Sequence, residues 1–204
     1  MGSLFQLPDE LVYTTLAASF PCREPQIRAL GTLLFVSLSI CPSYSLAPGA
    51  NKSQPNAAPC RNIVIHGTES TGKSAITEAL LEKLAENTGD PQTGVLKYAI
   101  VNSIECITGR HLFERTVGAV ADALDWENRP TRCENMSQLT VELSKMLLYS
   151  SQPAGSRFVL VLDAIDRQRE APMTLLPALA RLSEIVSRLS PPRDLSTIRN
   201  SGWY

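Results

Sequence analysis

The stretch Arg61–Ser74, RNIVIHGTESTGKS, decides the fold of this chain. Its second part, Gly67–Ser74, fits the pattern G-x-x-x-x-G-K-[ST] at every position, and its first part is apolar enough to form a buried strand. Glycine permits backbone conformations that turn successive N–H groups toward an anion, and the start of a following helix adds partial positive charge. The stretch therefore predicts a strand, a phosphate-binding loop and a helix, in that order.

The residues of this loop have distinct expected roles toward a nucleotide. Lys73 should reach the β- and γ-phosphates, and the Ser74 hydroxyl should bind Mg²⁺. Glu69 is unusual in a loop that binds anions, and we expect its carboxylate to point into solvent. The predicted nucleotide-binding residues of the loop are Gly67, Thr68, Glu69, Ser70, Thr71, Gly72, Lys73 and Ser74.

A second stretch, Arg157–Asp163 (RFVLVLD), predicts a buried strand that ends in a carboxylate. Asp163 is expected to hold Mg²⁺ through water, beside Ser74. Ala164 follows, where many ATP-hydrolysing proteins with such a phosphate loop have a glutamate that orients the attacking water. Alanine cannot accept a proton or position water, and Asp166 is a poor substitute because it lies three residues on and has a short side chain. We therefore expect binding of ATP and Mg²⁺ without efficient hydrolysis, and assign no catalytic residue.

Strands and helices alternate along the chain after residue 60. Strands that are separated by helices pair in parallel and are covered by helices on their faces. The sequence therefore predicts an α/β fold of three layers. The expected strands cover residues 61–66, 97–102 and 157–163, and the expected helices cover 73–87, 108–124, 137–148 and 173–189.

The segments beside this core differ from it in composition. Residues 1–40 predict an N-terminal helical segment, with one helix over 8–20 and a second from Glu24-Pro25, since proline suits a first helical turn. Residues 41–59, rich in proline, serine, alanine and asparagine, predict a surface loop. We assign 60–190 to the nucleotide-binding core and 191–204 to a divergent tail. Arg23 belongs either to an ordinary charged helix start or to a segment lying over the adenine.

Composition and charge exclude several classes of protein. Lysine and arginine number 19 against 20 aspartates and glutamates, so a net charge of −1 argues against a broad basic face for DNA. None of the five cysteines forms a C-x-x-C pair, which disfavours a zinc site. The longest apolar run, Ala29–Cys41, has 13 residues, fewer than the ~20 that span a bilayer. The sequence thus predicts neither a secreted nor a membrane protein.

Five motifs together resemble the origin recognition complex subunit 5 family, especially its fungal members. The resemblance implies an AAA+ fold of the RecA-like P-loop NTPase class, a nuclear location and the other subunits of the complex as partners. It implies that origin DNA is bound through the assembled complex, and that bound ATP stabilises a scaffold in replication initiation. Gly67, Gly72, Lys73 and Ser74 match the family's nucleotide loop. Asp163 matches its Mg²⁺ position, and Arg23 lies in the segment that the resemblance places near the adenine. The motifs are CREPQIRALGTLL (22–34), HGTESTGKS (66–74), AIVNSIECIT (99–108), FVLVLDAID (158–166) and LLPALARLSEI (175–185).

The sequence departs from this family after about residue 188. Family members continue into a strand that bears a sensor residue, a further strand, a helical lid and a winged-helix domain, whereas this chain runs through SPPRD (190–194) to Tyr204. In the family's strand order, 5-1-4-3-2, strand 4 lies between strands 1 and 3. We therefore expect a C-terminally truncated chain with an incomplete sheet, in which LSTIR (195–199) is at most a short substitute strand.

Two other interpretations stay open. The chain could be an ATP-hydrolysing P-loop NTPase of the signalling type, or a non-functional truncated fragment of the resembled family. A steady-state ATPase assay beside a nucleotide-binding assay separates the enzyme from the scaffold.

Overall fold

The computed structural model describes residues 10–39, 62–87, 95–130, 132–149, 157–168, 173–189 and 195–201. None of the described helices is long and apolar enough to cross a membrane. Two helices lie within the predicted segment 1–40, while the predicted loop 41–59 falls outside the described residues. The division into 1–40, 41–59, 60–190 and 191–204 stays a prediction.

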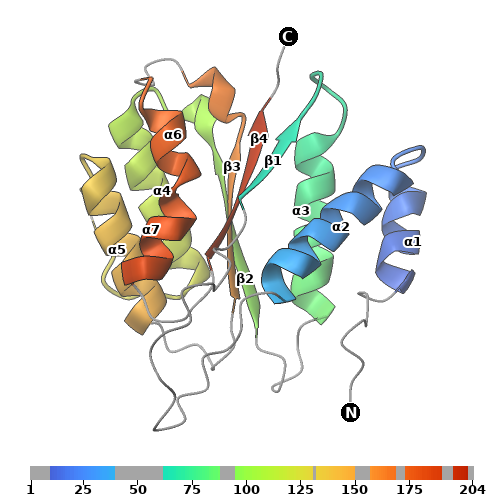
Figure 1. Ribbon diagram of the computed structural model, residues 1–204, viewed down its shortest axis with the longest axis horizontal. Helices are drawn as coiled ribbons and strands as arrows, with labels where there is room; N and C mark the ends of the chain where they lie inside the picture. The colour runs from blue at the N-terminus through green and yellow to red at the C-terminus, as the bar shows by residue number, and fades with distance from the viewer. Residues whose placement is uncertain are drawn as a thin grey trace, which may run out of the picture.

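A parallel sheet of four strands forms the middle layer, in the order β1-β4-β3-β2 (Figure 1). The strands are β1 (Ile63–His66), β2 (Leu96–Asn102), β3 (Arg157–Asp163) and β4 (Leu195–Ser201). Because all strands run the same way, their carboxyl ends meet at one edge of the sheet, with Asn102 paired to Asp163 and His66 to Ser201. The residues that follow β1 and β3 therefore share that edge.

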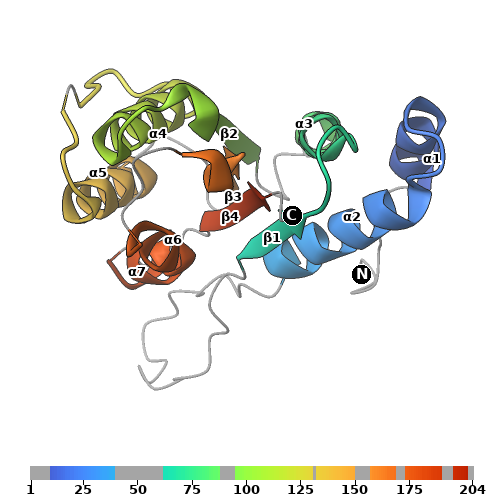
Figure 2. The ribbon, with the colours of Figure 1, turned by 90° about the horizontal axis from the view of Figure 1, so that it is seen from above.

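Helices cover both faces of this sheet (Figure 2). On one face, α3 (Lys73–Asn87) lies against the strands, with α1 (Glu10–Ser19) and α2 (Glu24–Ser39) beside it. On the other face lie α4 (Gly109–Ala123), α5 (Met136–Tyr149), α6 (Leu175–Ala180) and α7 (Leu182–Leu189). The three-layer α/β prediction is confirmed, and the predicted bounds of α3 and β3 match the structure residue for residue.

The alternation of side chains along β3 produces two separate cores. Phe158, Leu160 and Leu162 face the α4–α7 side, where they join the buried side chains of those helices. Val159 and Val161 face the α3 side and pack with residues from α1, α2 and α3. All five side chains are buried, which explains why this strand reads as a continuous apolar run.

The tail contributes more than the sequence predicts. Residues 195–201 form β4, a full-length strand that pairs in parallel with β1 on one side and β3 on the other. Ile198 stands opposite both Ile63 and Val161. The expectation of at most a short substitute is therefore corrected: backbone N–H and C=O groups, which both neighbours offer, are enough to pair a strand without a continuous apolar run.

Two helix boundaries also differ from the prediction. The expected helix over 173–189 is two helices, α6 and α7, joined at Arg181. The break leaves the Ala180 carbonyl free to accept a hydrogen bond from the Asn62 side chain, which in turn accepts one from Ser183 Oγ at 2.9 Å. α5 begins at Met136 rather than at the expected residue 137, and Asn135 Oδ1 accepts a hydrogen bond of 2.9 Å from the Gln138 N–H in its first turn.

Candidate nucleotide-binding site

The predicted phosphate loop connects β1 to α3 at the carboxyl edge of the sheet. Gly67 and Gly72 have φ angles of 147° and 82°, and Ser70 has a φ of 57°. Residues with a Cβ rarely adopt such angles, so the two glycines occupy positions where the turn requires them. α3 begins at Lys73, directly after the loop, and its N-terminus therefore faces the same space.

The Lys73 side chain is folded onto the loop. Its Nζ donates hydrogen bonds to the carbonyl oxygens of Gly67, at 2.9 Å, and Thr68, at 2.7 Å. Thr71 Oγ1 also donates to the Thr68 carbonyl, at 2.8 Å. The ammonium group thus lies within the loop, where it could exchange these two carbonyl oxygens for the oxygens of a bound anion.

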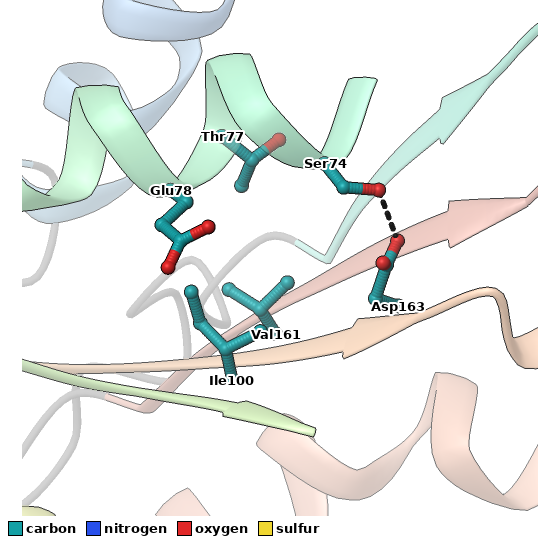
Figure 3. Close-up of a pocket in the computed structure, with 6 residues that line it drawn as sticks. All are labelled: Ser74, Thr77, Glu78, Ile100, Val161 and Asp163. Carbon is teal, nitrogen blue, oxygen red and sulfur yellow. Dashed lines mark hydrogen bonds between the residues drawn. The ribbon is translucent and has the colours of Figure 1, made fainter. Parts of the chain in front are cut away.

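The two predicted metal-binding residues lie in direct contact, although 89 positions separate them in the chain. Ser74 Oγ donates a hydrogen bond of 2.9 Å to Asp163 Oδ1, linking the first turn of α3 to the end of β3 (Figure 3). A hydroxyl and a carboxylate are the hard oxygen ligands that Mg²⁺ prefers. The donor set therefore fits a magnesium ion that keeps water and phosphate oxygens as its other ligands.

A small pocket of about 60 Å³ lies between α3 and the sheet beside this contact (Figure 3). Its wall contains Ser74 and Asp163 together with Thr77 and Glu78, and Ile100 and Val161 form its apolar part. Thr77 Oγ1 donates a hydrogen bond to the Lys73 carbonyl. Glu78 gives the pocket a second carboxylate beside that of Asp163. The sequence analysis did not select Glu78; its spacing of four residues from Ser74 on one helix could have indicated a shared face.

The chain turns sharply after Asp163. Ala164 adopts a left-handed conformation, with φ 49° and ψ 41°, and a 3-10 turn follows over Ile165–Arg167. Ile165 is buried, whereas Asp166 is exposed and is not among the residues that line the pocket. The geometry therefore brings no acidic side chain from this turn into the pocket beside Asp163.

Glu69 does not simply extend into solvent as expected. Its carboxylate forms an ion pair with the Arg167 guanidinium, and the two side chains are 46% and 43% exposed. The pair connects the phosphate loop to the turn that follows β3. The prediction missed it because nothing in the local sequence relates two residues almost 100 positions apart.

Arg23 is placed apart from the other predicted site residues. It lies in the turn between α1 and α2, where its N–H bonds to the Phe20 carbonyl and its carbonyl accepts from Ile27. In both views this turn lies beyond α3 from the sheet (Figures 1 and 2). A role for Arg23 near the adenine stays a prediction.

Comparison with known proteins agrees with this geometry. The chain is 26% identical over 182 residues to the origin recognition complex subunit 5 of Drosophila melanogaster, covering 87% of this chain and 32% of that protein. The resemblance inferred from the motifs is confirmed at this level. The chain spans about a third of that relative's length.

Several solved structures have the same fold at lower sequence identity. The ORC1 protein of Aeropyrum pernix in complex with DNA is 21% identical, with a TM-score of 0.61 over 90% of this chain and 39% of the other. Cdc6p from Pyrobaculum aerophilum is 19% identical, with a TM-score of 0.57 and coverage of 95% and 43%. The Drosophila ORC bound to DNA is 15% identical, with a TM-score of 0.58 and coverage of 100% and 47%.

The decisive match is to a family profile. The profile of the AAA ATPase domain matches residues 52–190, more than half of the 204 residues. This span contains the phosphate loop, Ser74 and Asp163, and it confirms the predicted P-loop fold class. The chain belongs to the AAA ATPase domain family.

Proposed function

We propose that this chain is an ATP-binding subunit of the origin recognition complex. The observation that carries the nucleotide part is the Ser74–Asp163 hydrogen bond beside a phosphate loop of the required conformation. The likeness to the Drosophila subunit supports the choice of complex. The proposal includes a nuclear location, the other subunits as partners and a part in replication initiation.

The loop residues 67–74 would hold ATP together with Mg²⁺. Backbone N–H groups of the loop would bind the phosphates, Lys73 would exchange its two carbonyl partners for phosphate oxygens, and Ser74 and Asp163 would hold the metal. Bound Mg²⁺ supplies positive charge next to the phosphates. An AAA ATPase domain is a nucleotide-binding fold, which supports this assignment of ligand class.

The nucleotide would act as a structural ligand. Ala164 offers no group that could orient a water, and Asp166 lies outside the pocket that Asp163 lines. ATP that binds the folded chain and is not turned over stabilises it by linkage, by about 2.7 kcal/mol at a concentration 100-fold above Kd. A scaffold held together by ATP follows from these properties.

Origin DNA would be contacted through the assembled complex. The net charge of −1 gives this chain no general attraction for a polyanion. Two of the solved structures with this fold contain DNA, which supports a DNA-bound assembly for the relatives. Mass spectrometry of the complex, purified through another subunit, should recover peptides of this chain; their absence would contradict membership.

A nucleotide-binding assay tests the site. Lys73→Ala should weaken ATP binding at least tenfold, because a hydrogen bond to a charged group contributes ~1.5–3 kcal/mol. Lys97→Ala is the matched control. Lys97 lies near the start of β2, away from the carboxyl edge that carries the phosphate loop, and pairs with Asp125. Removing the Lys97 side chain should leave ATP affinity unchanged. Equal ATP affinity in Lys73→Ala and the unmodified chain would refute the site.

A single-turnover experiment with labelled ATP tests the scaffold. ADP should form far more slowly than about 1 s⁻¹, the lower end of the usual enzyme range. Asp166→Ala should leave that slow rate unchanged. Fast ADP formation that Asp166→Ala abolishes would identify Asp166 as a working acid and favour the signalling-type NTPase.

A further inference from the structure

The Glu69–Arg167 ion pair joins the two halves of the site, and neither the fold nor the proposed chemistry requires it. Glu69 lies between Thr68, whose carbonyl binds Lys73, and the positive-φ residue Ser70. Arg167 lies four residues after Asp163. We propose that Arg167 is a positioning residue of the phosphate site: it offsets the negative charge that Glu69 places in the loop, and so preserves affinity for a nucleoside triphosphate. This inference rests on the proposed function.

The electrostatic argument starts from the ligand's charge. A nucleoside triphosphate brings several negative charges to a loop whose own acidic side chain would repel them. Two unit charges about 8 Å apart in water interact enough to change an equilibrium by a factor of about two, and several charges multiply that factor. Without the Arg167 charge, the Glu69 carboxylate would therefore weaken triphosphate binding by about threefold to tenfold.

Arg167 is held in place by its own segment. Ala164, in its left-handed conformation, reverses the chain after β3, and the Arg167 N–H bonds to the Ala164 carbonyl at 3.0 Å. Ile165 is buried in the core on the α4–α7 side, and this packing holds the turn against the sheet. The backbone of this turn is thus tied to the core, and the guanidinium that it carries pairs with Glu69 of the loop.

The pairing accounts for two unusual residues together. An acidic residue in a phosphate loop and a left-handed alanine after the metal-binding aspartate are each unfavourable alone. The turn at Ala164 is what brings Arg167 to Glu69. Because the offset acts through charge, its effect should grow with the number of phosphates and decline with salt.

Titrations of the full chain with fluorescent ATP and ADP test the inference. Arg167→Gln should weaken ATP binding about threefold to tenfold and ADP binding less, and salt should reduce the difference. Glu69→Gln should strengthen ATP binding by a comparable factor, because it removes the opposite charge from the same place. Glu69→Gln/Arg167→Gln should return to within about twofold of the original affinity, and Arg167→Lys should retain most of it, since both restore the charge balance.

Two controls separate the possible failures. Arg110→Gln breaks an exposed Arg110–Glu114 pair on α4 and should leave both nucleotide affinities unchanged. Unfolding curves should match among the variants, because the substituted side chains are half exposed. If the unmodified chain binds no nucleotide, the proposed function itself fails. The site is valid if the unmodified chain binds ATP and Lys73→Ala does not. In that case the inference alone is overturned by either of two results: normal ATP binding by Arg167→Gln, or a double variant that binds ATP as weakly as Arg167→Gln.

Discussion

The two faces of the sheet differ in what covers them and in what they contribute to the site. On the α4–α7 face, four helices bury a continuous apolar cluster, and the side chains of Lys73 and Ser74 are remote from it. On the α3 face, α3 lies against the sheet with α1 and α2 beside it, and α3 begins with Lys73 and Ser74. Binding chemistry is thus built on the α3 face. The α4–α7 face carries the larger apolar cluster, and β3 contributes to both.

Substitutions at neighbouring positions of β3 should give the largest contrast between the faces. Leu160 and Val159 are both fully buried but face opposite cores. Leu160→Ala should lower the free energy of unfolding by about 2–5 kcal/mol. Val159→Ala removes less buried apolar volume and should cost about 1–2 kcal/mol. Urea unfolding followed by circular dichroism measures both; a larger loss for Val159→Ala would reverse the comparison.

Alanine at two helical glycines should have opposite effects on the two faces. A Cβ on Gly31 in α2 would lie 2.4 Å from the hydroxyl oxygen of buried Tyr13, whereas a Cβ on Gly118 in α4 meets nothing within 4 Å. Gly31→Ala should destabilise the chain by about 1–3 kcal/mol through overpacking. Gly118→Ala should stabilise it by about 0.5–1 kcal/mol, because alanine favours helix. Thermal unfolding distinguishes them, and equal shifts would show that α1 and α2 do not pack as described.

Alkaline pH should lower the free energy of unfolding through the thiol of Cys133, which is buried on the α4–α7 face. Burial raises the pKa of Cys133 from 9.0 to about 11. Between these values the unfolded chain loses the proton while the folded chain keeps it, so stability is intact below pH 9 and falls as pH rises. The expected loss by pH 10 is about 1 kcal/mol. Urea unfolding at pH 8 and 10 measures it; Cys133→Ala should show a shallower decline, and an identical decline would contradict the assignment.

The smallest expected effect lies where the two faces meet, after β3. Ala164→Gly should raise the free energy of unfolding by about 0.5–1 kcal/mol, because the relief of a left-handed alanine exceeds the added entropy of the unfolded chain. Ala119→Gly, in the interior of α4, is the control and should destabilise by a similar amount. If both substitutions destabilise, the turn after β3 does not hold the conformation described.

The sequence predicted best the elements whose pattern is local. The phosphate loop predicts the start of α3 because its glycines and Lys73 follow a fixed spacing. The end of β3 is predicted because its apolar run stops at the charged Asp163. The break at Arg181 was missed because Leu175, Leu179, Leu182 and Val186 stay on one helical stripe across it. Apolar periodicity cannot detect a backbone carbonyl that turns to a side chain such as Asn62.

The candidate site shows the same limit. Ser74 and Asp163 could be paired in advance because the phosphate loop implies a carboxylate at the end of a neighbouring strand, and their contact follows. The Glu69–Arg167 pair and the conformation of Ala164 could not, since both depend on how the chain turns after β3. Likewise β4, with polar residues at several positions, takes its place through pairing on both sides.

The position of β4 also determines when the sheet can form during synthesis. Ile63 pairs with Ile198, so β1 has no neighbour within the described sheet until residues 195–201 have left the ribosome. Contacts between residues so distant in sequence raise the contact order and slow folding. Until then β1 presents unpaired backbone on both edges, a state that favours association with chaperones or aggregation. The nascent chain is thus exposed longest at the strand that leads into its phosphate loop.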